Sequence, residues 1–243
     1  MKSRTYLVTG ASRGLGAIIT RRLLSDGHRV LAISRHEGGV LPELQEGAGE
    51  RLRHLSLDLG DLAGLRSRVF TEWIGKETPV DGLVNNAAMA VDDLVTNLDP
   101  VSLERLFRVN VYAPMELTRG VLRNCLLHKT CGSLVHISSV CAHTGYKGLA
   151  MYAATKGALE AFSKNVAREW GARGIRSNAI VCGFMETDMN ASLEEAFRER
   201  IYRRTALGSP TDPESVAAMV AYLLSDEARS VTGQSLPVDS GTL

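Results

Sequence analysis

The sequence predicts an α/β fold in which a single doubly wound parallel sheet carries helices on both faces. Short apolar runs rich in Val, Ile and Leu alternate with longer segments of helical period, as repeated β-α units do. The apolar runs lack the alternation of half-exposed strands, so both faces of the sheet should be covered. A glycine-rich turn at residues 9–16 joins the first apolar run to the first helical segment, which is typical of such a sheet.

Each expected element follows from its own stretch of sequence. The strands are the short apolar runs, at residues 6–8, 30–33, 52–57, 83–84, 134–137, 177–181 and 236–238. The helices are the longer segments between them, which include residues 15–25, 62–74, 103–125, 150–170 and 213–224. Asp26-Gly27 should end the first helix, because glycine suits a helix C-terminus. Residues 185–207 break the alternation, and we expect a small helical lid there beside the sheet.

Length and composition favour one domain spanning residues 1–243. No repeat or Pro/Gly-rich linker divides the chain, and 44% hydrophobic with 23% charged residues is ordinary for a soluble globular domain. The 28 Lys and Arg nearly balance the 27 Asp and Glu, so a net charge of +1 does not favour nucleic acid or an anionic membrane as partner. No apolar run reaches the roughly 18 residues of a membrane span.

Cysteine and histidine patterns give no sign of a metal site. The four cysteines form no C-x-x-C pair and have no histidine at zinc-finger spacing. We therefore expect reduced thiols in a cytoplasmic enzyme, without a bound metal. His136 lies within an expected strand and is interpreted as a hydrogen-bonded core residue.

The glycine-rich turn from Thr9 to Gly16 predicts a phosphate site. Glycine lacks a Cβ, so the backbone can approach a pyrophosphate, and the N–H groups at the positive end of the next helix stabilise its charge. Tight β-α turns also use glycine for packing alone. The position of this turn in the first β-α unit nevertheless favours nucleotide binding.

The second residue beyond the second expected strand distinguishes between the two nicotinamide dinucleotides. A protein that prefers NAD usually carries Asp or Glu there for the ribose 2′-hydroxyl, whereas this chain has Arg35. The guanidinium groups of Arg35 and of Arg13 in the glycine turn can bind a 2′-phosphate. We therefore expect NADP(H) as cofactor; the alternative is that both arginines are solvated surface charges.

Tyr152 and Lys156 lie four residues apart at the start of an expected helix, and hence on one face of it. A nearby ammonium lowers the pKa of a phenol, so Tyr152 is predicted to exchange a proton near neutral pH. Ser139, at the end of an expected strand, can hydrogen-bond a substrate carbonyl oxygen. A Tyr-Lys pair at this spacing can arise by chance. The glycine turn, the serine and the pair converge on one edge of the sheet, which argues against chance.

Together these motifs resemble those of the short-chain dehydrogenase/reductase family, whose members have a Rossmann-type fold, over essentially the whole chain. The matching segments are Thr9-Gly10 through Gly16, Asp58, Asn85-Asn86-Ala87, Asn110, Ser139, Tyr152 with Lys156, Val231-Thr232-Gly233 and Val238-Asp239.

The resemblance implies a role for each catalytic candidate. Tyr152 would protonate a carbonyl as hydride arrives from the nicotinamide, and Ser139 would polarise the oxygen. Lys156 would bind the nicotinamide ribose and tune Tyr152, while Asn110 would hold a water in a proton relay. The alternative for Asn110 is an amide that caps or braces the backbone.

The resemblance also implies cofactor contacts along the same edge of the sheet. Asp58 and Leu59 would face the adenine, Asn86 and Ala87 would line the ribose, and Thr187 would contact the cofactor. The whole implied set is Gly10, Ser12, Arg13, Gly14, Leu15, Gly16, Arg35, Asp58, Leu59, Asn86, Ala87, Ala88, Tyr152, Lys156, Gly183 and Thr187.

Within the family, residues 183–189, 225–228 and 232–233 resemble the 3-oxoacyl-acyl-carrier-protein reductases. Those enzymes of fatty-acid and polyketide synthesis reduce a β-ketoacyl thioester to the β-hydroxy form. Their carrier protein is acidic, and the resemblance implies docking at Arg173, with Lys129 near a second docking position. The alternative is that both residues are merely solvated.

The resemblance further implies a homotetramer, assembled through the helix that carries Tyr152 and through the C-terminal segment ending at Leu243. The apolar content of residues 158–167 permits such helix pairing, although a core-facing stripe would look the same.

Two positions depart from the family pattern. Asn86-Ala87-Ala88 stands where the family usually has Asn-Ala-Gly, so Ala88 would be strained if its φ were positive. Cys182-Gly183 replaces the usual Pro-Gly, which frees the backbone beside the nicotinamide. We interpret Cys182 as an inert, protonated, apolar residue; oxidation sensitivity is the alternative.

Two other functions remain open from the sequence. The chain could act on a sterol, a sugar or another secondary alcohol, because residues 185–207 would determine the substrate. It could also be a non-catalytic nucleotide-binding or structural subunit of the same fold.

Overall fold

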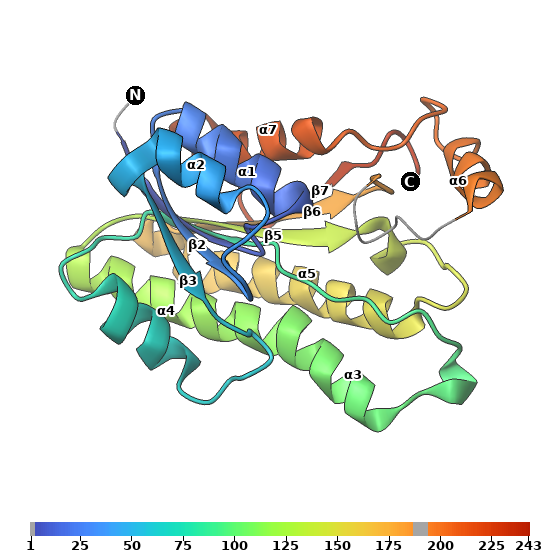
Figure 1. The fold of residues 1–243 in the computed structure, drawn as a ribbon, viewed down its shortest axis with the longest axis horizontal. Coiled ribbons are helices and arrows are strands. Elements are labelled where there is room, and N and C mark those ends of the chain that lie inside the picture. The colour runs from blue at the N-terminus through green and yellow to red at the C-terminus, as the bar shows by residue number, and fades with distance from the viewer. Residues whose placement is uncertain (1–2, 187–193) are drawn as a thin grey trace.

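The computed structural model describes residues 3–186 and 194–243. Its seven strands are all parallel and follow the order β3-β2-β1-β4-β5-β6-β7 (Figure 1). They are β1 (Thr5–Thr9), β2 (Arg29–Ser34), β3 (Leu52–Ser56), β4 (Gly82–Asn85), β5 (Ser133–Ser139), β6 (Arg176–Cys182) and β7 (Ser235–Val238). The predicted doubly wound sheet and each of its seven predicted strands are thus confirmed.

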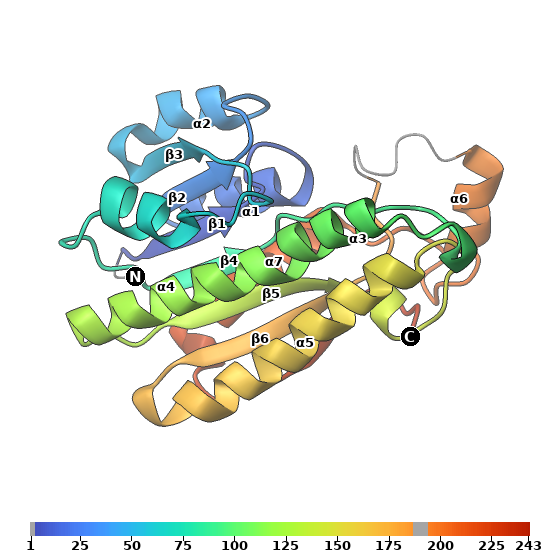
Figure 2. The same ribbon diagram turned by 90° about the horizontal axis from the view of Figure 1, so that it is seen from below.

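Helices cover both faces of this sheet. On one face lie α1 (Gly14–Ser25), α2 (Leu41–Ala48) and α7 (Pro213–Leu224) (Figure 1). The other face carries α4 (Ala113–His128) and α5 (Ala150–Trp170), and α3 (Pro100–Phe107) leads into α4 (Figure 2). The remaining helix, α6 (Glu195–Tyr202), stands beyond the carboxyl ends of the strands, within the stretch predicted to form a lid. Short 3₁₀ segments occur at Gly49–Arg51, Val95–Asn97, Val140–Ala142, Gly171–Arg173 and Asp226–Ala228.

Three helical predictions need correction. The expected helix over residues 103–125 is interrupted by a π-helical segment, Arg108–Tyr112, because Pro114 at the start of α4 cannot donate the N–H of a regular α-helical turn. Of the expected helix 62–74, residues 65–74 are helical, and Ser67–Ile74 within them is π-helical. Helix α2 was not predicted: it buries one residue, Leu41, so its apolar period is too weak to detect.

Two apolar cores separate the sheet from its two helical layers. Ile19 of α1 and Val220 of α7 pack against strand residues such as Val8. Behind the sheet, Leu117 of α4 packs against residues such as Leu7, so neighbouring residues of β1 face opposite cores. All five residues of β1 are buried, which explains why its sequence shows no alternation. Among the described residues, no helix is long and apolar enough to cross a bilayer.

A chain of buried polar side chains crosses the sheet around His136. Asn85 Nδ2 lies 3.1 Å from His136 Nδ1, and His136 Nε2 lies 3.3 Å from Ser177 Oγ. Ser177 Oγ is in turn 2.9 Å from Ser163 Oγ of α5. Burial lowers the pKa of His136 to about 3, with the nearby charge of Lys156 acting in the same direction. His136 is therefore a neutral, hydrogen-bonded core residue, as predicted.

Neutral His136 should make the fold sensitive to acid. Between the unfolded pKa of about 6.5 and the folded pKa of about 3, the unfolded chain binds a proton that the folded chain excludes. The stabilisation is complete above the unfolded value and is lost as the pH falls through this window. In denaturant titrations across this pH range, His136→Asn should be less stable at neutral pH but should lose less stability on acidification. His36→Gln, at an exposed site, serves as control; equal pH slopes for His136→Asn and wild type would contradict the assignment.

Candidate active site

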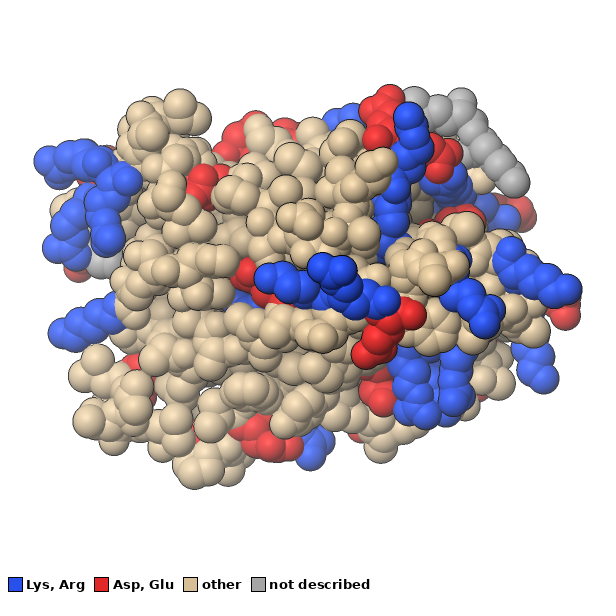
Figure 3. All heavy atoms as spheres, turned by 180° about the vertical axis from the view of Figure 1, so that it is seen from behind, with Lys and Arg blue, Asp and Glu red and all other residues tan. Residues whose placement is uncertain are grey.

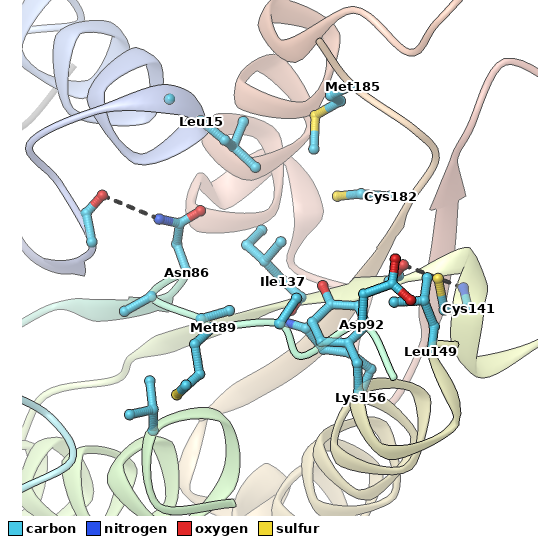
Figure 4. Close-up of a pocket in the computed structure, with 18 of the residues that line it drawn as sticks. Leu15, Asn86, Met89, Asp92, Ile137, Cys141, Leu149, Lys156, Cys182 and Met185 are labelled. Carbon is cyan, nitrogen blue, oxygen red and sulfur yellow. Dashed lines mark hydrogen bonds between the residues drawn. The ribbon is translucent and has the colours of Figure 1, made fainter. Parts of the chain in front are cut away.

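The carboxyl ends of the strands open onto a cavity of about 1570 Å³. Its walls contain every predicted cofactor residue within the described part of the chain, together with Ser139, Tyr152 and Lys156. Thr187 lies outside the described residues. Asn110 is buried behind the wall. Figure 4 shows Leu15 and Asn86 on one side of this cavity, and Cys141, Leu149 and Lys156 on another.

The glycine turn is packed so closely that side chains would not fit. Gly10 and Gly14 have φ angles of +68° and +54°, which favour glycine. A Cβ on Gly10 would lie 2.9 Å from Asn86 Nδ2, and one on Gly16 would overlap the carbonyl oxygen of Gly10. No described side chain caps the N-terminus of α1, so the N–H groups of its first turn can bind a phosphate. The turn therefore fits a dinucleotide diphosphate.

The segment after β4 is fastened to the glycine turn. The Thr9 hydroxyl accepts hydrogen bonds of 3.0 Å from both the Asn86 and the Ala87 backbone N–H groups. The Asn86 side chain donates to the Thr9 carbonyl oxygen at 2.9 Å. These bonds join two cofactor-facing segments from distant parts of the sequence.

Charged residues line the part of the cavity beyond β2 and β3. Arg13 and Arg35 are both exposed and both border the cavity. Asp58 accepts hydrogen bonds from the Gly60 N–H at 2.8 Å and from Arg105 at 2.9 Å. Both hydrogen bonds lower the pKa of Asp58, and the bond from Gly60 has the larger effect. The carboxylate is therefore ionised at neutral pH. Sequence reasoning missed Arg105, because no local pattern links it to Asp58, 47 positions away.

The three residues predicted to act on a carbonyl meet in the same cavity. Ser139 ends β5, and Tyr152 and Lys156 lie in the first two turns of α5. The Ser139 hydroxyl accepts the Cys141 N–H at 3.2 Å, and Ser139 and Tyr152 both line the cavity. Lys156 Nζ lies 5.5 Å from the centre of the Tyr152 ring and donates to the Ile137 carbonyl oxygen at 2.7 Å. The structure thus brings two hydroxyl groups and one ammonium group together in the wall of one cavity.

The predicted lowering of the Tyr152 pKa is wrong. Burial is the largest influence and raises the pKa of the phenol, while the nearby Ser139 side chain acts in the opposite direction. Lys156 Nζ is bound to a backbone carbonyl instead, and burial lowers its pKa to about 8. At neutral pH Tyr152 therefore keeps its proton and can act as an acid, and Lys156 is mostly cationic.

Asn110 braces the site from behind. Its amide oxygen accepts the Met89 N–H at 2.9 Å, and its nitrogen donates to the Met89 carbonyl at 2.8 Å and to Thr155 Oγ1 at 3.1 Å. Thr155 Oγ1 donates to the Tyr152 carbonyl at 2.7 Å. The side chain thus fills the bracing role that the sequence left open, and its part in a water relay stays a prediction.

The two departures from the family pattern leave the site intact. Among the described residues, positive φ outside glycine occurs only at Lys129 and Ser240, so Ala88 carries no left-handed strain. Cys182 ends β6 as a buried free thiol, and burial raises its pKa to about 12 despite the opposing charge of Lys156. The thiol is therefore protonated, as predicted. Cys141, a further free cysteine of the cavity wall, was not recognised from the sequence.

The remaining part of the cavity carries polar and charged side chains. Tyr146 lines it, and the Arg204 guanidinium lies 5.5 Å from the centre of the Tyr146 ring. Asp92 lies against Gly148, where a Cβ would overlap its carboxylate, and also borders the cavity. No motif marks Asp92 or Arg204 in the sequence.

A dinucleotide cradle beside a Ser-Tyr-Lys site, at the carboxyl edge of a doubly wound sheet, defines a nicotinamide-dependent oxidoreductase. Residues 10–242 match the family model described as Enoyl-(Acyl carrier protein) reductase. The chain belongs to this family, which is part of the short-chain dehydrogenases/reductases.

Individual relatives align along almost the whole chain. The protein is 35% identical to the 3-oxoacyl-[acyl-carrier-protein] reductase FabG of Salmonella typhimurium, over 99% of this chain and 97% of that one. Among solved structures, a putative NAD(P) dependent gluconate 5-dehydrogenase from Beutenbergia cavernae with bound NADP has a TM-score of 0.93 at 30% identity, covering 100% and 97% of the two chains. A blue fluorescent protein from a metagenomic library, in complex with NADPH, has a TM-score of 0.88 at 33% identity, covering 98% and 97%.

The packing of the glycine turn leads to a first test of the site. In Gly16→Ala the new methyl would overlap backbone, at a cost of about 1–3 kcal/mol, so NADPH affinity should fall roughly tenfold or more. Gly47→Ala is the matched control: this exposed α2 glycine has open space around its Cβ position, and alanine should stabilise the helix by about 0.5–1 kcal/mol. Fluorescence titration with NADPH and thermal unfolding measure both effects. Wild-type affinity in Gly16→Ala would refute the proposed cradle.

Proposed function

We propose that the protein is an NADPH-dependent ketoreductase that converts a 3-oxoacyl thioester on acyl carrier protein to the 3-hydroxyacyl form. The observation that carries the chemistry is the Ser139–Tyr152 hydroxyl pair beside Lys156, at a cavity with a diphosphate cradle. The substrate class is supported by relatives named 3-oxoacyl-[acyl-carrier-protein] reductase, including one that is 35% identical along 99% of the chain.

The residues around the cavity suit NADPH. The glycine turn and the first turn of α1 would hold the diphosphate, and Arg13 and Arg35 would hold the 2′-phosphate. Asp58 and Leu59 would face the adenine, and residues 86–88 would line the ribose. When bound, the cofactor supplies the hydride.

The protein's own groups would activate the carbonyl and supply a proton. Ser139 and Tyr152 would both donate hydrogen bonds to the substrate oxygen, and these bonds strengthen as negative charge develops there. Tyr152 would then transfer its proton to the oxygen, and the Lys156 ammonium would stabilise the phenolate that remains. Lys156 and a water near Asn110 would return the proton from solvent. Because the pKa of Lys156 is about 8, activity should decline at more alkaline pH.

Removing the phenol hydroxyl tests the proposed acid. Tyr152→Phe should lower kcat for ketone reduction by roughly 10²–10⁴-fold and leave NADPH affinity nearly unchanged. Tyr222→Phe is the matched control, because Tyr222 is an exposed residue of α7 outside the cavity wall. Steady-state kinetics and cofactor titration provide the two readouts. A Tyr152→Phe variant that turns over at the wild-type rate would exclude this role.

Acyl-carrier docking would use cations on the surface. Arg173 ends the 3₁₀ segment after α5, and Lys129 follows α4; both are exposed. An acidic carrier protein would be steered by such residues, mainly through encounter rather than through buried contacts. A short-chain reductase that acts on a free small molecule would show no preference for a carrier-bound substrate.

NADPH consumption, compared with NADH, should be measured with a β-ketoacyl thioester on a carrier protein and on a small thioester mimic. We expect faster turnover per unit concentration of the carrier-bound substrate. Arg173→Glu should raise its KM by roughly five- to tenfold, since a rim ion pair contributes up to about 1 kcal/mol, and should leave the mimic unaffected. Arg21→Glu, on the exposed surface of α1, is the control. Equal effects on both substrates would count against docking.

A second candidate function is oxidation or reduction of a small anionic alcohol or ketone. Lys147 and Arg204 border the cavity, and Figure 3 shows Lys and Arg side chains at both ends of the molecule, including the end that carries α6. Such cations fit a carboxylate-bearing substrate. The solved relative named a putative gluconate 5-dehydrogenase supports the same possibility. In the assay above, turnover of a hydroxy or keto acid with no advantage for carrier-bound substrate would favour this candidate.

We further propose a homotetramer in the cytoplasm. Exposed apolar side chains along α3 and α4 would suit an interface; they include Val101 and Leu127, with exposed fractions of 76% and 61%. Within residues 158–167 of α5, Leu159 and Val166 are buried in the chain's own core, so part of that stripe serves the fold.

A further inference from the structure

A buried carboxylate with no part in the proposed chemistry lies directly behind the catalytic residues. Glu160 is 9% exposed and lies one helical turn after Lys156, on the same face of α5. Its Oε1 accepts a hydrogen bond of 2.5 Å from the buried Ser138 hydroxyl. His143 Nε2 lies 2.9 and 3.1 Å from the two Glu160 oxygens. Burying a charge is costly, so this arrangement requires a physical reason.

The order of contacts excludes a hydrolytic triad. In such a triad the histidine lies between the hydroxyl and the carboxylate, whereas here Glu160 lies between Ser138 and His143. Ser138 is also only 1% exposed, and its hydroxyl donates its proton to Glu160 rather than to a histidine.

The cluster instead connects the two elements that carry the active site. Ser138 is the neighbour of Ser139 at the end of β5, and Glu160 follows Lys156 on α5. The Lys156–Ile137 bond of 2.7 Å lies beside the Ser138–Glu160 bond, so two adjacent links join the strand end to the helix. Loss of the second link would let Ser139 move relative to Lys156.

Glu160 also supplies negative charge where Lys156 needs it. The described groups that act electrostatically on Lys156 or that face it are Tyr152 and Glu160 on α5, His136 on β5, and the thiols of Cys141 and Cys182. Burial raises the pKa values of the phenol and both thiols and lowers that of His136, so these four groups are neutral at neutral pH. Glu160 is therefore the member of this set that can offer a negative charge to the Lys156 ammonium.

We propose that Glu160 is a positioning residue of the reaction, held by Ser138 and His143 so that its carboxylate aligns Ser139 with Lys156 and stabilises the ammonium of Lys156. His143, with 38% of its side chain exposed, covers the carboxylate, which has 11% exposed, and so limits its screening by water. This inference rests on the catalytic roles proposed above for Ser139 and Lys156.

The test is the pH profile of ketone reduction in Glu160→Gln, which keeps the side-chain shape but removes the charge. Without the carboxylate, Lys156 should lose its proton at lower pH, so the alkaline limb of kcat should move down by roughly one unit, as expected for one nearby opposite charge. Glu169→Gln, at an exposed position of the same helix, should leave the limb in place. A uniform fall in kcat at every pH, with the limb unmoved, would reduce Glu160 to a structural role and overturn the proposal.

Two more variants keep the proposal testable if Glu160→Gln folds poorly. His143→Ala changes an exposed residue and should shift the limb in the same direction by a smaller amount, because water then screens Glu160. Ser138→Ala should lower kcat without moving the alkaline limb of the pH profile downward. If Ser138 and Glu160 act together, Ser138→Ala should lower kcat by a smaller factor in the Glu160→Gln background than in wild type. Full additivity of Ser138→Ala and Glu160→Gln would contradict the alignment.

The pH dependence of NADPH affinity distinguishes failure of this inference from failure of the proposed function. If wild type reduces no ketone, the proposed function fails, and the titration still reports on Lys156 through the cofactor that it would bind. We expect weakening of NADPH binding to begin at lower pH in Glu160→Gln than in wild type. Identical binding profiles would overturn the electrostatic part of the inference.

Discussion

The hydrogen bond from Lys156 to the Ile137 carbonyl is the interaction on which the active site depends. It fixes a buried cation at the junction of β5 and α5, at a length of 2.7 Å. Burial alone would favour the neutral amine, and the pKa of Lys156 is accordingly lowered to about 8. In the proposed mechanism a neutral amine could not stabilise charge on Tyr152, so the backbone carbonyl and the carboxylate of Glu160 would help to keep this lysine cationic.

The same junction also suits the acid role proposed for the phenol. Tyr152 is held beside Ser139 in surroundings that raise its pKa, so it retains a proton at neutral pH. A group that must donate in one step and be reprotonated before the next is better held protonated than ionised. The favourable state of this site is therefore a neutral phenol near a positive ammonium, rather than the ion pair that the spacing of the two residues suggests.

Most of the fold and most residues of the site could be predicted from the sequence. The contacts that join these residues to partners elsewhere in the chain could not. Apolar runs identify strands well when both faces are buried, as in β1, and the glycine turn identifies the cradle. Helix α2 was not predicted, because it buries a single residue and so shows no clear apolar period. The sign of the Tyr152 pKa shift escaped because burial depends on tertiary packing, which outweighs the spacing of two residues along a helix. Arg105 and Asn110 act through partners brought close only by the completed fold.

The Thr9–Asn86 hydrogen bonds have a consequence for the growing polypeptide. Thr9 belongs to β1 and Asn86 follows β4, so the two halves of the cradle are 77 positions apart. A chain still attached to the ribosome has its glycine turn early, but the turn lacks its supporting partner until β4 has emerged and paired with β1. Cofactor capture during synthesis must therefore wait for that pairing, and a premature stop codon before β4 would leave a fragment with the glycine motif and without a finished nucleotide pocket.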